Sequence, residues 1–277
     1  MLGSGNANNV GGADPSPWFI NNTIRFNNIS HTVGASSDSN KTVCVHGKGG
    51  TDCRDIVWGV YLDGAAAGID VVGNIIGSTL HGAVFDNAGG NNTQTNNIFL
   101  ADGDSLAMMD FGAQGGNNNP LPDGKPSSTE IAGNTVQRNI FYWTGNITHV
   151  LASQDPWGDG FLKPHRGKGC DHNLYYNPHL GAEGTAASRV FPGDSNLSVW
   201  QHLHIGTQLR EVAIEHDMHS IIADPLFVDP ARGNFDLLPG SAALALGFQP
   251  IPPIVAPTAR CGGRAGADCL AMVLGQD

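Results

Sequence analysis

Charged side chains are scarce in this sequence of 277 residues, where they make up 14%, and basic side chains are the scarcest. The 14 Lys and Arg are outnumbered by 25 Asp and Glu, and the longest basic stretch, residues 163–168, suits a solvated loop. A nucleic-acid-binding protein normally carries a basic patch, so the net charge of −11 predicts no nucleic-acid partner. No apolar run approaches the roughly 20 residues that a membrane span needs, so we expect no membrane partner either.

Cysteine is also sparse, and its spacing excludes a zinc ribbon because none of the five residues forms a CxxC pair. Cys44 and Cys53 lie nine residues apart, and Cys261 and Cys269 lie eight apart, each pair in Gly-rich sequence. This spacing predicts two local disulfides, with Cys170 left free. Because disulfides persist in oxidising compartments, we expect a secreted protein.

N-glycosylation sequons point to the same compartment, although an Asn-rich chain also produces them by chance. Their acceptors are Asn21, Asn28, Asn40, Asn91, Asn146 and Asn196. The N-terminus lacks the charged start and apolar core of a signal peptide, which predicts a removed leader or an excised fragment.

An internal repeat is the strongest positive signal in the sequence. Residues 59–81 and 82–104 align without a gap at an offset of 23, and Asn-Ile-Phe recurs 42 residues after Asn97. Each copy holds short apolar runs between Gly and Asn, which are residues of tight corners. A run of four or five apolar residues suits a strand and is too short for a helix.

The repeat predicts a right-handed parallel β-helix over residues 1–250, built from coils of about 23 residues, with a disulfide-linked tail over 251–277. A short helix near Trp200, opened by Asp194 or Ser195, is also expected. Stacked coils would place equivalent Asn side chains one strand spacing apart, where they hydrogen-bond in a ladder. The candidates for this ladder are Asn28, Asn74, Asn97 and Asn139. The rival architecture is an antiparallel sandwich, which does not require a fixed period.

Aspartates recur at the strand ends of this repeat. In the gapless alignment Asp63 falls on Asp86, and alternation along each strand would turn both outward, with their carboxylates one strand spacing apart. Glycoside hydrolysis uses such a carboxylate pair. Further carboxylates follow at Asp102, Asp104 and Asp110. The alternative roles are turn capping and binding of Ca²⁺, which is the one cofactor that the sequence leaves open.

Aromatic and imidazole side chains accompany these carboxylates. Sugar rings stack on aromatic faces, so we predict a polysaccharide-binding surface, with core packing as the alternative for each ring. Its predicted members are Trp58, Tyr61, His81, Asp102, Trp143 and His149. The pairs His202/His204 and His216/His219 show no third ligand, so the sequence predicts no metal site.

The segment Trp58-Gly59-Val60-Tyr61-Leu62-Asp63, followed by Asn74-Ile75-Ile76 and Asn97-Ile98-Phe99, resembles the β-helix glycoside hydrolases, which include α-L-fucosidase and xylanase types. Residues 220–230 and 233–242 are similar to the tail that closes many such proteins, so the resemblance covers about residues 18–250. It implies hydrolysis of plant or algal polysaccharide by an acidic pair that begins at Asp63. The second carboxylate would lie about two coils on, near Asp102 or Asp104.

Three functions follow from these patterns. The first is a secreted glycoside hydrolase that uses Asp63, Asp86 and Asp104. The second is a non-catalytic, glycosylated structural or carbohydrate-binding β-helix, whose exposed coil edges would let chains associate end to end. The third is a Ca²⁺-dependent polysaccharide lyase or epimerase, for which Lys163, His165 and Arg166 are the only clustered basic candidates.

Overall fold

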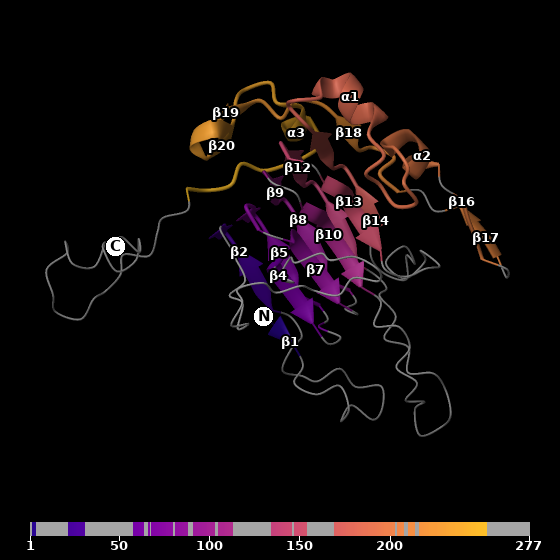
Figure 1. The fold of residues 1–277 in the computed structure, drawn as a ribbon. Coiled ribbons are helices and arrows are strands. Elements are labelled where there is room, and N and C mark those ends of the chain that lie inside the picture. The colour runs from indigo at the N-terminus through magenta and orange to yellow at the C-terminus, as the bar shows by residue number, and fades with distance from the viewer. Residues whose placement is uncertain are drawn as a thin grey trace, which may run out of the picture.

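The computed structural model describes residues 2–3, 22–30, 58–63, 66, 68–79, 81–87, 91–102, 105–112, 134–145, 147–153, 169–202, 204–207, 210–213 and 216–253. Three parallel β-sheets dominate this part of the chain (Figure 1). The strands of these three sheets pair only in parallel, so the antiparallel sandwich is wrong and the predicted all-β parallel architecture is confirmed at this level.

Each sheet is named here by the order in which the chain first visits it. The first sheet contains, side by side, β1 (Leu2–Gly3), β4 (Trp58–Asp63), β7 (Gly82–Asn87), β10 (Ser105–Gly112) and β13 (Ile147–Ser153). The second contains β2 (Thr23–Arg25), β5 (Asp70–Val72), β8 (Thr93–Thr95), β11 (Thr135–Gln137) and β14 (Gly169–Asp171). The third contains β3 (Asn28–Ile29), β6 (Ile75–Ile76), β9 (Ile98–Ala101), β12 (Ile140–Trp143), β15 (Leu174–Tyr176) and β18 (Ile221–Ile222).

From β1 to β15 the chain visits the three sheets in strict rotation, so each of these coils adds one strand to every sheet, and β18 then extends the third sheet alone. The stack is therefore compatible with a β-helix-like solenoid. Between β5 and β8 and between β6 and β9 the register follows the predicted offset of 23, with Asp70 opposite Thr93 and Ile75 opposite Ile98. Between β4 and β7 in the first sheet the offset is 24, because Val60 lies opposite Val84. That one extra residue determines which side chains of β7 face the interior.

An asparagine ladder runs along the corner between the second and third sheets. Asn97 is typical: its Nδ2 donates to the Asn139 Oδ1 at 3.1 Å, and its Oδ1 accepts from the Asn74 Nδ2 at 3.1 Å. The predicted ladder is confirmed at these three positions, but its first member is Asn27, which donates to Asn74, and not Asn28. The ladder continues through Asn173 and ends at Ser220, whose Oγ accepts the Asn173 amide.

Apolar side chains from all three sheets fill the interior of the stack. In the third sheet Phe99, Phe141 and Tyr175 are in register and fully buried, with ring centroids 5.1 and 5.0 Å apart. This distance is close to the strand spacing, so the coil repeat itself produces the aromatic stack. Cys170 is buried in the same core and free, as predicted, whereas Cys44, Cys53, Cys261 and Cys269 lie outside the described residues.

The C-terminal segment covers the outer face of the third sheet, where Phe227 and Phe248 pack against Ile98, Ile140 and Leu174. This segment comprises the antiparallel pair β19 (Phe227–Asp229) and β20 (Asn234–Leu237), the 3-10 helix η2 (Pro230–Arg232) and α3 (Ala242–Ala245). A second antiparallel pair, β16 (His204–Thr207) and β17 (Arg210–Ala213), follows α2 in the sequence.

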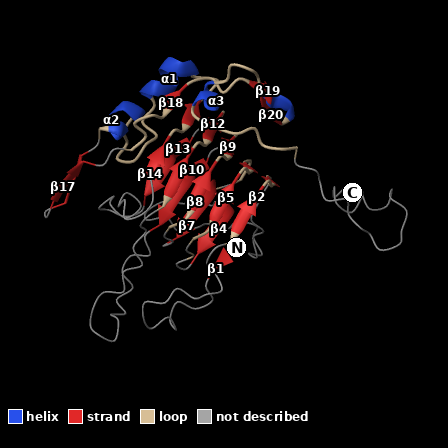
Figure 2. Cartoon of the chain, turned by 180° about the vertical axis from the view of Figure 1, so that it is seen from behind, coloured by secondary structure: helices blue, strands red, loops and turns tan. Residues whose placement is uncertain are grey.

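Helices α1 (Gly181–Ala187) and α2 (Leu197–Gln201) lie at the end of the stack that holds β13 and β14, as Figure 2 shows from behind. The predicted helix near Trp200 is therefore present as α2, but Asn196 caps it and not Asp194 or Ser195, since the Asn196 side chain accepts from the Val199 amide. No helix in the described ranges is long and apolar enough to cross a membrane.

Candidate functional site

The predicted outward pair of Asp63 and Asp86 does not form. Asp86 is fully buried, and its Oδ2 accepts a hydrogen bond from the Asn92 Nδ2 at 2.9 Å. Asp86 lies opposite Leu62, an interior residue, because the offset between β4 and β7 is 24 and not 23. A shift of one residue moves every side chain of a strand to its other face, which is why the predicted orientation of Asp86 is wrong.

The other candidate carboxylates are separated in the structure. The structure describes the backbone of Asp63 in β4 and not its side chain, and Asp104 lies outside the described residues. Asp102 is exposed after β9, where its Oδ2 accepts from the Ser78 hydroxyl at 2.6 Å. Asp110 lies opposite Phe85 in the first sheet, so the register places it on the same face as Phe85, and the residue is 2% exposed.

Four rings gather on the outer face of the first sheet, and we call them the outer aromatic cluster: Trp58, Tyr61, His81 and Phe85. Phe85 stacks on Trp58 at 5.1 Å and lies 4.9 Å from Tyr61, while His81 is 4.8 Å from Trp58. The cluster is separate from the interior core, which contains Val60 and Leu62 of β4. Tyr61 and His81 remain partly exposed. The structure thus brings three of the predicted substrate-binding residues together.

His149 belongs to the same sheet, because β13 places it opposite Ala107, a member of the apolar group around Trp58 and Phe85. Burial lowers the pKa of His149, and the charge of Asp194 counteracts part of that shift. Trp143 differs from these residues: it is 2% exposed and packs in the interior core. It therefore offers no face to a sugar ring, and the alternative of core packing holds for it.

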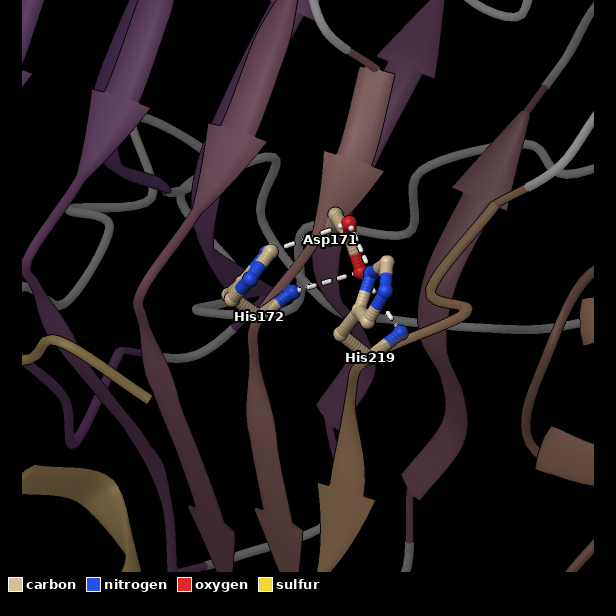
Figure 3. A group of neighbouring side chains, drawn as sticks. All are labelled: Asp171, His172 and His219. Carbon is tan, nitrogen blue, oxygen red and sulfur yellow. Dashed lines mark hydrogen bonds and ion pairs between the residues drawn. The ribbon is translucent and has the colours of Figure 1, made fainter. Parts of the chain in front are cut away.

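A second cluster lies where β14 ends, and it was not predicted. Asp171 lies between His172 and His219, two rings that come from consecutive coils (Figure 3). The Asp171 Oδ2 is 3.1 Å from the His172 Nδ1 and 2.9 Å from the His219 Nδ1. The Asp171 Oδ1 accepts the backbone amides of His172 and His219, each at 2.8 Å. We call these three residues the Asp–His cluster.

The electrostatics of the Asp–His cluster favour a charged carboxylate. Burial raises the pKa of Asp171, but the hydrogen bonds from the His219 ring and from the two backbone amides, together with the charge of His172, outweigh this effect. The net pKa of Asp171 lies below its usual value. The side chains of His172 and His219 are 43% and 67% exposed, so the cluster is open to solvent.

A buried network behind the Asp–His cluster fixes the loop that carries His219. Asp217 is fully buried and accepts hydrogen bonds from four side chains, namely Asn173 at 3.1 Å, Tyr175 at 3.1 Å, Trp200 at 2.7 Å and Ser220 at 2.5 Å. Burial raises the pKa of Asp217, although these hydrogen bonds oppose that shift. His216 stacks on Trp200 at 5.1 Å, and its Nδ1 accepts from the Cys170 amide.

Sequence reasoning missed the Asp–His cluster because its members lie 47 residues apart. The signal was nevertheless present: Asn173-Leu174 and Ser220-Ile221 are in register, so the residues before them, His172 and His219, occupy equivalent positions. The predicted glycosylation sites give a mixed picture. Asn28 and Asn91 are exposed and Asn196 is half-buried, while Asn21, Asn40 and Asn146 lie outside the described residues.

The comparisons with known proteins add no relative from which a role could be transferred. No family model, curated protein or solved structure matches the chain, so any function has to be argued from its own residues.

Proposed function

We propose that this chain is a right-handed parallel β-helix of the glycoside-hydrolase type, secreted, and that it binds polysaccharide on the outer face of the first sheet. The right hand follows from the general handedness of crossovers between parallel strands. The family follows from the resemblance in β4, β6 and β9, and three-sheet rotation with an Asn ladder agrees with it.

The outer aromatic cluster is the observation that carries the proposal. The rings offer a flat apolar face, and a sugar ring presents the flat C–H surface that stacks on such a face. Tyr61 and His81 are the partly exposed members, so they would contact the sugar, while Trp58 and Phe85 support them from below. His149 lies in β13, two strands beyond β7, and would extend the contact along the sheet.

Hydrolysis would need two carboxylates on this same face. Of the carboxylates whose side chains the structure describes, Asp110 is the one that shares the face with the outer aromatic cluster, because it lies opposite Phe85. We therefore assign the catalytic pair to Asp110 and Asp63 in place of Asp86. Asp86 instead holds the corner through Asn92, which also donates to the Ala66 carbonyl.

The binding step is tested by affinity electrophoresis of the full chain in gels that contain plant and algal polysaccharides, neutral and acidic. We expect retardation by at least one of them, and about tenfold weaker binding for Tyr61→Ala, as the loss of one stacked ring of about 1.4 kcal/mol predicts. Tyr176→Ala is the matched control, since it removes a partly exposed tyrosine from the third sheet. Equal retardation of both variants, or no retardation by any polysaccharide, would contradict the proposal.

The hydrolytic step is tested on the polysaccharides that bind, by release of reducing ends. Asp110→Asn is expected to abolish release and to retain binding, whereas Asp236→Asn, which changes an exposed aspartate of β20, is expected to leave both unchanged. Full activity in Asp110→Asn would refute the assignment of the pair.

A non-catalytic carbohydrate-binding protein is the second candidate, and the burial of Asp86 favours it, because the stacked pair that suggested hydrolysis is absent from the face. Binding without any release of reducing ends by the wild-type chain is the outcome that would support this candidate. Self-association through coil edges also stays a proposal, to which the exposed Thr23 and Arg25 of edge strand β2 are relevant.

A further inference from the structure

We propose that Asp171, His172 and His219 form a binding site for a divalent transition metal, and that Zn²⁺ is the ion that this donor set suits best. The ligands would be the Asp171 Oδ2 and one ring nitrogen from each histidine. This site lies at the corner between the second and third sheets and is independent of the polysaccharide surface on the first sheet.

The coil repeat explains why the two imidazoles meet. His172 and His219 precede the ladder residues Asn173 and Ser220, and in the next positions Leu174 lies opposite Ile221. Equivalent residues of consecutive coils are one strand spacing apart. The two rings accordingly stack with centroids 4.9 Å apart and planes inclined by 23°.

The backbone at this corner points the His172 side chain outward. His172 has a φ of 56°, a left-handed conformation that Asn96 and Arg138 share at the same position of earlier coils. In those coils the side chains are an amide and a guanidinium, neither of which pairs with a second histidine. The last two coils are the only ones in the described ranges that place imidazoles there.

Asp171 holds the ligand atoms together. Its Oδ1 is occupied by two backbone amides, which fixes the carboxylate plane, and its Oδ2 faces both Nδ1 atoms at 3.1 and 2.9 Å. Tetrahedral zinc with bonds of about 2.0–2.1 Å separates its ligands by about 3.3 Å. The two O–N separations are therefore close to what the ion requires, and the three ligand atoms all lie within 4.8 Å of one another. Water would complete the coordination.

The chemistry of the donors selects the class of metal. Two imidazoles and one carboxylate suit zinc and its transition-metal neighbours, whereas Ca²⁺ and Mg²⁺ prefer six or more oxygen ligands. The exposure of His172 and His219 gives the ion a path from solvent. Bound metal would tie the end of β14 to the loop before β18, so it would stabilise the last coil.

The test measures equivalents of Zn²⁺ bound per full chain by equilibrium dialysis, after removal of metal with a chelator. His172→Ala and His219→Ala are each expected to bind one equivalent fewer than His179→Ala, which removes an exposed histidine outside the Asp–His cluster. Asp171→Asn keeps an oxygen for the two backbone amides and is expected to bind zinc at least about tenfold more weakly. Circular dichroism establishes that each variant is folded.

Thermal unfolding supplies a second readout, because an ion that binds only the folded chain raises its Tm. Zn²⁺ should raise the Tm of the wild type and of His179→Ala more than that of His219→Ala. Ca²⁺ should change the Tm of all three proteins by the same amount. Equal zinc stoichiometry in His172→Ala, His219→Ala and His179→Ala would overturn the proposal. A rise in Tm with Ca²⁺ that His219→Ala abolishes would overturn the choice of a transition metal.

Discussion

Replacement of Asn97 by alanine tests whether the asparagine ladder stabilises the stack. Asn97 is fully buried and its side chain makes four hydrogen bonds. Its Nδ2 donates to the Val71 carbonyl at 2.8 Å and to the Asn139 Oδ1 at 3.1 Å. Its Oδ1 accepts from the Asn74 amide at 2.9 Å and from the Asn74 Nδ2 at 3.1 Å. Alanine removes all four at once.

The expected loss follows from the number of these bonds. A hydrogen bond contributes a net of about 0.5–1.5 kcal/mol, so four of them amount to about 2–6 kcal/mol. Native domains are stable by roughly 5–15 kcal/mol, so Asn97→Ala should lose a large part of the free energy of unfolding. Urea unfolding followed by circular dichroism measures this difference from the shift of the midpoint.

Two further variants isolate the ladder from the change in volume. Asn28 is exposed and follows Asn27, the first ladder residue. Asn28→Ala should therefore lower the free energy of unfolding by less than about 0.5 kcal/mol. Asn97→Asp keeps the shape of the side chain but loses both N–H donors and buries a charge, so it should also be strongly destabilised at neutral pH. If Asn97→Ala unfolds at the same urea concentration as Asn28→Ala, the ladder does not hold the coils together and the reasoning fails.

Three other predictions concern single buried groups. Burial lowers the pKa of His216 to about 4 in the folded chain, whereas the imidazole of the unfolded chain keeps a pKa of about 6.5. Between these two pH values the unfolded chain binds a proton at His216 and the folded chain does not. The free energy of unfolding should therefore fall by about 3 kcal/mol as the pH drops from about 6.5 to about 4. If urea unfolding of His216→Gln shows the same loss over this pH range as the wild type, His216 is not the cause. Burial raises the pKa of the Cys170 thiol well above its usual value, so mass spectrometry should find it alkylated only after unfolding. A methyl group on Gly82 would collide with the Ala107 carbonyl and the Trp58 ring, so Gly82→Ala should lower the Tm. The fall is about 4–8 °C per kcal/mol for a small domain and less for a larger one. An unchanged Tm would contradict the close contact of Gly82 with Ala107 and Trp58.

The architecture was predictable because the repeat is a property of adjacent sequence. Asn74 and Asn97, or Ile75 and Ile98, match at a fixed offset, and stacking converts that offset directly into parallel pairing. The prediction failed where the offset changed by a single residue. Between β4 and β7 the coil gains one residue, and the interior then receives Val84 and Asp86 in place of Phe85.

The sites were harder to predict than the fold, for two physical reasons. A carboxylate gives no sequence signal of its face, so Asp86, which was predicted to point outward, is buried once the register shifts by one residue. An insertion of variable length between coils also hides pairs such as His172 and His219, although the matching Asn173 and Ser220 beside them mark the equivalent positions.

The end of the stack shows how the ladder, the buried network and the Asp–His cluster depend on one another. The last asparagine of the ladder is Asn173, and Ser220 occupies the equivalent position in the next coil. The Ser220 Oγ accepts a hydrogen bond from the Asn173 backbone N–H, and the Asp217 Oδ1 accepts one from the Asn173 Nδ2. The Asp217 carboxyl group can occupy this buried position because the Trp200 indole and the Tyr175 hydroxyl also donate to it. The same turn brings His219 over Asp171. Termination of the ladder therefore places two histidines and a carboxylate on the surface, and a metal bound there would reinforce the last coil that the structure describes.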